Sequence, residues 1–125
     1  MRFCREDSLP CHLSGADGAY QIGEAVLVPD FAYKITPMSD DYPDPVPPLW
    51  VAEVISPTDK AVDLRLKRAI YRQAKILLWE IYPQSSSVDV YAPGEPLREF
   101  GIADTLDAGD LLPGFSLMVK YLLDS

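Results

Sequence analysis

The alternation of apolar and polar residues along the chain predicts a β-sheet with one helix packed against it. Residues 24–35 are rich in strand-forming residues but are interrupted by Pro29 and Asp30, which indicates a strand pair or one bent strand. Residues 49–55 (LWVAEVI) are short, almost wholly apolar and bounded by proline, which is typical of a strand buried on both faces of a sheet. The prolines within residues 36–48 predict a loop between these segments.

A helix is predicted for residues 60–74, after a turn in which Thr58 or Asp59 supplies the capping side chain. Residues 76–82 (ILLWEIY) predict the next strand, and the alternation in residues 87–92 predicts its hairpin partner. This order indicates a mixed sheet flanked by helices, in the α/β (α+β) class. The helical period rests on residues that recur at intervals of three and four: Val62, Leu66, Ala69, Ile70 and Gln73.

The length of 125 residues predicts a single domain, residues 1–125, in which residues 1–23 form a loosely ordered N-terminal arm. No apolar run reaches the roughly 18 residues of a membrane span, and no signal-peptide pattern is present, so we expect a cytoplasmic protein. The 11 Lys and Arg residues against 19 Asp and Glu residues give a net charge of −8. This charge argues against binding nucleic acid through bulk charge, so that any such contact would be local.

Two carboxylates are candidates for chemistry because both stand among apolar residues. An ionised Glu53 within LWVAEVI is costly to bury unless it lies at the sheet edge, pairs with an arginine or belongs to a site. Asp30, after Pro29, is the second. If the two carboxylates converge, they repel each other unless a cation lies between them, and their oxygen atoms suit Mg²⁺ or Mn²⁺.

The predicted helix concentrates the positive charge of the chain. At about 100° per residue, Arg65, Arg68 and Arg72 lie on its outer face, where they either form an ordinary solvated surface or contact phosphates. Lys67 falls at the margin of the apolar stripe and can lean toward the sheet.

The motifs VPD (28–30), PPLWVAEVISPTD (47–59), VDLRLKRAIY (62–71), LLWEIYP (77–83) and DTLDAGDLLPGF (104–115) resemble a large bacterial family, numerous in cyanobacteria. Its members are labelled putative restriction endonucleases and belong to the PD-(D/E)XK nuclease-like superfamily. The resemblance implies a restriction-endonuclease-like fold, N-terminally shortened here.

Carried to this chain, the resemblance implies that Asp30 and Glu53 bind a metal ion together with the main-chain carbonyl of Val54. The superfamily lysine that follows the second acid by two positions is replaced by Ile55, and Lys67 matches the lysine that this family supplies from the next helix. Asp30, Glu53 and Lys67 would then be catalytic, with supporting roles for Ser56 and Tyr71 and nucleic-acid contacts from Arg65, Arg68 and Arg72.

The function expected from this resemblance is Mg²⁺- or Mn²⁺-dependent hydrolysis of nucleic-acid phosphodiester bonds, with DNA as the expected substrate. The alternative is a catalytically inactive member that acts as a DNA-binding or protein-interaction module, favoured by the net charge and by the loss of the family's aspartate from the Trp79–Pro83 segment. An acidic subunit that inhibits or partners another protein is a third reading. An open sheet edge makes a homodimer the expected assembly.

Overall fold

Among the residues that the computed structural model describes (12–14, 18–34, 40–41, 43–111 and 114–123), six strands form one mixed sheet in the order β1-β4-β5-β6-β7-β8. All neighbouring pairs are antiparallel except β5 and β6, which are parallel. The predicted mixed sheet flanked by helices is therefore confirmed. The strands are β1 (His12–Ser14), β4 (Phe31–Lys34), β5 (Trp50–Val54), β6 (Leu77–Tyr82), β7 (Ser87–Tyr91) and β8 (Arg98–Phe100).

Helix α2 (Ala61–Gln73) makes the crossover that two adjacent parallel strands require. It begins after the turn that follows β5 and returns the chain to the start of β6. The 3-10 helix η1 (Pro83–Ser85) then joins β6 to β7, with Ser86 in the left-handed conformation at φ 52°. The predicted strand, helix and hairpin are all present, each within two residues of its expected bounds.

Residues 24–35 form two strands that do not pair with each other. β3 (Ala25–Leu27) pairs with β2 (Tyr20–Ile22) in a separate hairpin, and its tight turn places Gly23 at φ 61°, a conformation that glycine adopts readily. After Pro29 the chain enters β4, which pairs with β1 and β5. The prediction of a strand pair or one bent strand is correct in placing strands here but wrong about their pairing, because β3 pairs with β2 and β4 pairs with β1 and β5.

The part of the expected N-terminal arm that the structure describes is ordered. β1 pairs with β4, and Tyr20 and Ile22 of β2 are buried. The aromatic ring of Tyr20 and the branched chain of Ile22 supply apolar area for the core, which explains why this segment packs down instead of lying loose. Residues 1–11 and 15–17 of the arm lie outside the described residues.

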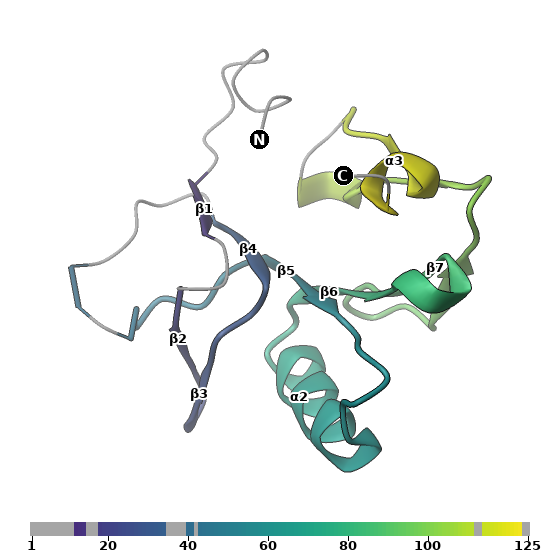
Figure 1. Ribbon diagram of the computed structural model, residues 1–125. Helices are drawn as coiled ribbons and strands as arrows, with labels where there is room; N and C mark the ends of the chain where they lie inside the picture. The colour runs from purple at the N-terminus through teal and green to yellow at the C-terminus, as the bar shows by residue number, and fades with distance from the viewer. Residues whose placement is uncertain (1–11, 15–17, 35–39, 42, 112–113, 124–125) are drawn as a thin grey trace.

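The two faces of the sheet are covered by different segments (Figure 1). On the face toward α2, Val51 and Leu78 pack around the buried ring of Tyr71. On the opposite face, Trp50 and Trp79 pack with the C-terminal segment. That segment contains β9 (Thr105–Leu106), η2 (Gly109–Leu111), β10 (Leu117–Met118) and α3 (Val119–Leu123).

No helix in the described part of the chain is long and apolar enough to cross a membrane.

The orientation of α2 differs from the one that its apolar residues predict. Val62 and Leu66 are exposed, by 62% and 61%, and Tyr71 is the buried residue of the helix. The side chains that face the sheet therefore lie along Leu64, Lys67 and Tyr71, spaced three and four apart. Polar contacts with the sheet therefore determine the orientation of α2, and its longer apolar stripe is not buried.

The predicted helix cap is also wrong. The N-cap position is Lys60, which makes no side-chain capping hydrogen bond. Instead, Asp59 Oδ2 accepts a hydrogen bond from the Ser56 N–H at 2.7 Å, which closes the turn after β5. Thr58 contributes to the same turn, because its N–H donates to Ser56 Oγ at 3.2 Å.

Arg68 anchors α2 to the sheet, although its spacing predicted an outward position. Its Nε and one terminal nitrogen donate to the two oxygens of Glu80 at 2.9 and 2.8 Å. Tyr82 donates to the same carboxylate at 2.9 Å. Glu80 is buried, and an unpaired charge there would be costly. Three hydrogen bonds stabilise the carboxylate, and Arg68 supplies the compensating charge.

We expect Arg68→Met to lower the free energy of unfolding by about 3 kcal/mol, because it leaves the Glu80 carboxylate buried without a counter-charge. The double variant Arg68→Met/Glu80→Met should regain most of this loss, since both charges are then gone. Urea unfolding at neutral pH measures both effects, and Arg65→Met, an exposed change on the same helix, should stay within about 0.5 kcal/mol of the wild type. A double variant less stable than the single one would contradict this account.

Candidate active site

Glu53 lies near the end of β5 with its side chain directed at α2. The residue is only 6% exposed. Its Oε2 accepts a hydrogen bond from the Tyr71 hydroxyl at 3.3 Å and another from Lys67 Nζ at 3.4 Å. Tyr71 and Lys67 are four residues apart on α2 and so share one face of the helix. One turn of α2 thus supplies both of the side-chain donors to the buried carboxylate.

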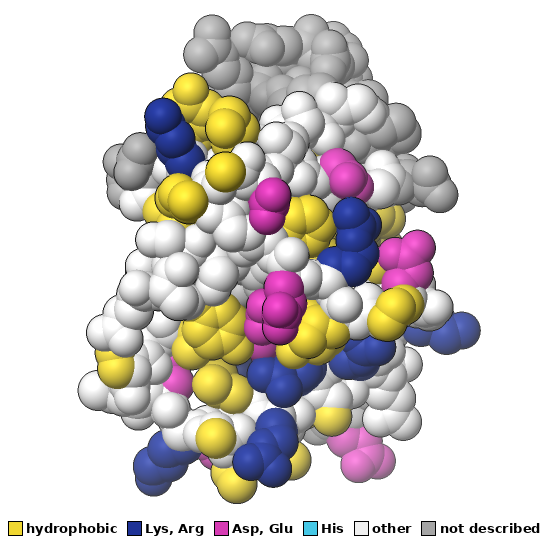
Figure 2. Space-filling model, turned by 90° about the vertical axis from the view of Figure 1, so that its right-hand side faces the viewer, with side chains coloured by type: hydrophobic (Ala, Val, Ile, Leu, Met, Phe, Trp, Pro, Cys, Tyr) yellow, Lys and Arg dark blue, Asp and Glu magenta, His cyan; other side chains and the backbone are white. Residues whose placement is uncertain are grey.

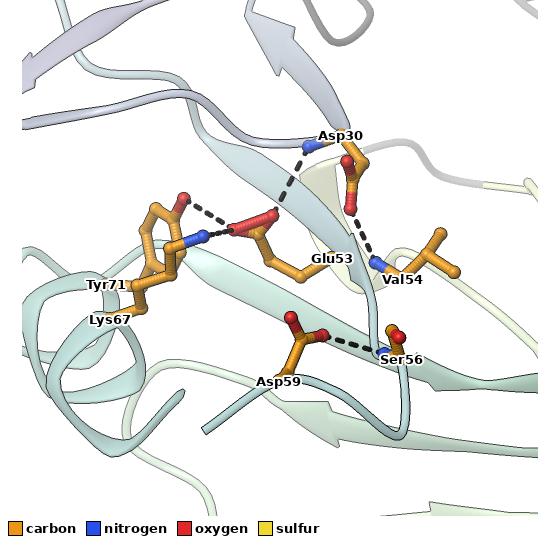
Figure 3. A network of polar contacts seen from close by, with 7 residues as sticks. All are labelled: Asp30, Glu53, Val54, Ser56, Asp59, Lys67 and Tyr71. Atoms are coloured by element: carbon orange, nitrogen blue, oxygen red, sulfur yellow. Dashed lines mark hydrogen bonds and ion pairs between the residues drawn. The ribbon is translucent and has the colours of Figure 1, made fainter. Parts of the chain in front are cut away.

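Asp30 reaches the same carboxylate from the other side (Figure 3). Its N–H donates to Glu53 Oε1 at 3.3 Å, and its own Oδ2 accepts from the Val54 N–H at 2.7 Å. Asp30 stands just before β4, whose antiparallel pairing with β5 aligns Phe31 with Ala52. The two acids are therefore neighbours because of strand pairing, although 23 positions separate them in the sequence.

The electrostatic balance of this site favours binding of a cation. Burial raises the pKa of Glu53 above its ordinary value of 4.5, the Lys67 ammonium opposes this, and the Asp30 carboxylate adds to it. Burial, with help from the Glu53 carboxylate, also raises the pKa of the Tyr71 hydroxyl, so Tyr71 remains a hydrogen-bond donor. Two carboxylates face a single ammonium group that is 42% exposed. An acid with a raised pKa beside a second acid is a feature that functional sites often show.

A cavity of about 560 Å³ opens between the end of β5 and α2. Its lining includes Asp30, Glu53, Val54, Lys67 and Tyr71. This volume falls in the range of sites that bind small molecules or a portion of a larger substrate. The carboxylates therefore border accessible space and are not sealed in the core.

The structure brings together five of the residues predicted for the site. Ser56 is not among them, since its side chain is 2.9 Å from the Thr58 hydroxyl and its N–H bonds to Asp59. Its role is in the turn. The five that meet are Asp30, Glu53, Val54, Lys67 and Tyr71.

The three arginines predicted to bind nucleic acid have separate environments. Arg65 is exposed on α2. Arg68 is held by Glu80, and Arg72 lies with its guanidinium 5.1 Å from the centre of the Tyr91 ring. The predicted outward orientation of Arg68 is wrong, because a buried carboxylate attracts it to the sheet.

A row of carboxylates across the sheet was not predicted. Glu53 aligns with Glu80, Glu80 with Asp89, and Asp89 with Glu99, on four neighbouring strands. Burial raises the pKa of Asp89, and the charges of Glu99 and Glu80 raise it further. The sequence did contain a signal for Glu80. The segment LLWEIY places a glutamate in an apolar strand, just as LWVAEVI does for Glu53.

The oxygen atoms near Glu53 are suited to binding a hard cation. Asp30 and Glu53 provide carboxylate oxygens, and Val54, whose N–H donates to Asp30 Oδ2, follows Glu53 in the chain and has a main-chain carbonyl to offer. Among the described residues, no group of three or more His, Cys, Asp or Glu side chains could hold a metal ion. A cation here would therefore have two carboxylates as its protein side-chain ligands and would keep several waters, as Mg²⁺ commonly does.

Comparison with known proteins found a matching family model and a similar solved structure. The family model Uma2, described as "Putative restriction endonuclease", matches residues 2–120. Among solved structures, that of a putative nuclease belonging to DUF820 from Anabaena variabilis ATCC 29413 superposes with a TM-score of 0.79 at 16% identity, over 98% of this chain and 74% of that chain. This likeness confirms the predicted nuclease-like fold. A search of curated proteins found no match.

The raised pKa of Glu53 makes stability depend on pH. In the interval above 4.5, the unfolded chain has lost this proton while the folded protein still holds it, so stability falls as the pH rises through the interval. We expect Glu53→Gln to be more stable than the wild type at pH 8 and to lose most of this advantage at pH 4. Thermal unfolding at both pH values measures the difference, with the exposed change Glu24→Gln as the control. An advantage of Glu53→Gln that is equal at the two pH values would contradict this cause.

Proposed function

This chain belongs to the Uma2 family, described as "Putative restriction endonuclease", and we propose that it is a metal-dependent endonuclease that hydrolyses phosphodiester bonds, with DNA as its substrate. The observation that carries the proposal is that Asp30, Glu53 and Lys67, from three separate segments, border one cavity. Two acids and one amine in this arrangement suit the PD-(D/E)XK type of nuclease site. A cytoplasmic location, expected from the sequence, stays a prediction.

The residues that would hold Mg²⁺ or Mn²⁺ are Asp30 and Glu53, with the main-chain carbonyl of Val54 as a further oxygen ligand. When bound, the ion supplies a Lewis acid that polarises the phosphate and lowers the pKa of a bound water. The two carboxylates hold their positions before any ion binds, because the Asp30 and Val54 N–H groups already fix them at 3.3 and 2.7 Å. Such preorganisation limits the rearrangement needed during the reaction.

Lys67 has the freedom that its proposed role requires. Its contact with Glu53 is long, at 3.4 Å, and its side chain is 42% exposed. The ammonium group can therefore turn from Glu53 toward a phosphate oxygen or a water in the cavity. There it would stabilise the charge that develops on the phosphorus oxygens.

The surface beside the cavity supplies local positive charge on an acidic protein. Figure 2 shows Lys and Arg side chains gathered in the lower part of the molecule, interleaved with hydrophobic ones. On α2, Arg65 is exposed and Arg72 is exposed at its C-terminal end. We propose that these two contact backbone phosphates, which gives an affinity that falls as salt rises. Arg68 is left out, because its Nε and one terminal nitrogen already bind the Glu80 carboxylate.

A second candidate is a catalytically inactive member that binds DNA or protein. The net charge of −8 and the Lys67–Glu53 ion pair favour it, since the pair already neutralises part of the charge that would attract a metal ion. Calorimetric titration with millimolar Mg²⁺ or Mn²⁺ separates the two candidates. Absence of heat from the wild type would favour the inactive module.

We expect the wild type to cut plasmid or single-stranded DNA in the presence of Mg²⁺ or Mn²⁺. Glu53→Ala and Lys67→Ala should each reduce the rate by about 100-fold or more, because each removes a charged group that acts on the reacting phosphate. Lys120→Ala is the matched control, since it removes an exposed lysine from α3. DNA that stays intact with all four proteins, or that all four cut equally, would refute a nuclease centre at this site.

We also propose that the protein forms a homodimer. Val62 and Leu66 are exposed on consecutive turns of α2, and the outer edge of β8 pairs with no other strand in the described part of the chain. Light scattering should then give twice the chain mass of 13.9 kDa, and Leu66→Lys should shift the protein toward the monomer. A wild type that is monomeric at all concentrations would contradict this assembly.

A further inference from the structure

The buried carboxylate of Glu53 is held from α2 by two side chains of different character. Tyr71 and Lys67 both donate to its Oε2, at 3.3 and 3.4 Å, and both approach from the helix (Figure 3). Lys67 brings a positive charge and its side chain is 42% exposed, whereas Tyr71 brings a neutral hydroxyl and is fully buried. The two donors are therefore not equivalent, although they bind the same oxygen atom.

Tyr71 is fixed in position by its surroundings. Its ring belongs to the apolar cluster on the α2 side of the sheet, which also contains Val51, Ile76 and Leu78. A ring in a close-packed core has little freedom to turn, so the hydroxyl stays directed at Glu53. Burial raises the pKa of this hydroxyl, so it keeps its proton and continues to donate.

Lys67, in contrast, competes with a metal ion for the same carboxylate. Its ammonium group and the ion are both positive, so each is attracted to Glu53 and each repels the other. The Lys67 side chain borders the cavity and is partly exposed, so it has space to turn into when an ion binds. Once Lys67 has turned away, the Tyr71 hydroxyl is the donor from α2 that still holds Oε2.

A neighbouring acid shows the contrasting arrangement. Glu80, which aligns with Glu53 on the adjacent strand, also accepts a hydrogen bond from a tyrosine, Tyr82, at 2.9 Å. Its basic partner is Arg68, which binds both carboxylate oxygens at 2.9 and 2.8 Å. The basic partner of Glu53 makes a single, longer contact. Glu53, unlike Glu80, can therefore exchange its basic partner for a metal ion while it keeps its tyrosine.

We propose that Tyr71 is the positioning residue of the site, whose neutral hydroxyl keeps the Glu53 carboxylate in place while Lys67 gives way to the metal ion and turns toward the phosphate. This inference rests on the proposed nuclease function. A hydrogen bond from a neutral donor orients a metal ligand and leaves the negative charge of the ligand available to the ion. Removal of such an orienting group commonly weakens metal binding by about 10- to 100-fold.

Calorimetric titration with Mn²⁺, in the absence of nucleic acid, tests this role. We expect Tyr71→Phe, which removes the hydroxyl but keeps the ring, to bind Mn²⁺ about tenfold more weakly than the wild type. Lys67→Met should bind Mn²⁺ at least as tightly as the wild type, because it removes a competing positive charge. Tyr82→Phe is the matched control, since it removes the hydroxyl that donates to Glu80, and it should leave the Mn²⁺ affinity unchanged.

Cleavage of DNA provides the second measurement. The rate of Tyr71→Phe should fall at low Mn²⁺ but return to within about twofold of the wild-type rate at saturating Mn²⁺, because the loss lies in metal affinity. Lys67→Met should stay slow at saturating Mn²⁺, because it lacks the amine that acts on the phosphate. A role of Tyr71 in packing alone would not produce a loss that added metal ions restore.

The outcomes separate this inference from the proposed function. Equal Mn²⁺ affinity of Tyr71→Phe and the wild type, or a loss of about tenfold in Lys67→Met, would overturn the positioning role and leave the nuclease function standing. Weaker binding by Tyr71→Phe without cleavage by any of the proteins would support the role of Tyr71 and refute the nuclease function. A wild type that binds no Mn²⁺ would refute both. The comparison of Lys67→Met with the wild type involves no change at Tyr71, so it stands even if Tyr71→Phe folds poorly.

Discussion

The burial of the Glu53 carboxylate in the middle of the sheet is the constraint on which the site depends. β5 is apolar on both faces except at this position, and an isolated charge there would be costly. Hydrogen-bond donors stabilise the carboxylate from two directions. The Asp30 N–H donates from the β4 side, and the Lys67 and Tyr71 side chains donate from α2. These bonds are all between 3.3 and 3.4 Å, longer than the mode for their type. The carboxylate is therefore held in place but remains able to take a stronger partner.

The rotation of α2 follows from a second carboxylate beside the first. The parallel register of β5 and β6 aligns Glu53 with Glu80 on neighbouring strands, which lie about 4.8 Å apart. Consecutive residues of α2 serve the two acids, Lys67 for Glu53 and Arg68 for Glu80. Satisfying both turns the Leu66 side of the helix to solvent. The bidentate pair at Glu80 fixes the helix, whereas the pair between Lys67 and Glu53 is longer, at 3.4 Å against 2.8 Å.

The sequence alone predicts β5, β6, β7, the crossover helix and the choice of Asp30 and Glu53, because each depends on local composition or on a charge placed in an apolar segment. The choice of Lys67 depends on the family resemblance, and β1 and β2 were not predicted. It predicts the rotation of α2 wrongly, since the recurrence of Val62, Leu66 and Ala69 indicates a buried face, whereas the structure leaves these residues exposed. Local patterns contain no information on the register between β5 and β6, so the pairing of Arg68 with Glu80 could not be found from them. The pairing of β3 with β2 was missed for the same reason.

Alternation along one strand gives the two faces of β5 different chemistry. Val51 and Glu53 point toward α2, while Trp50 and Ala52 point toward the C-terminal segment. One face therefore carries an acidic site, and the other carries the aromatic rings of the core. Asp30 stands just before β4 and borders the cavity of the acidic site. A single strand thus separates a face that solvent can reach at its end from a face that packs the interior.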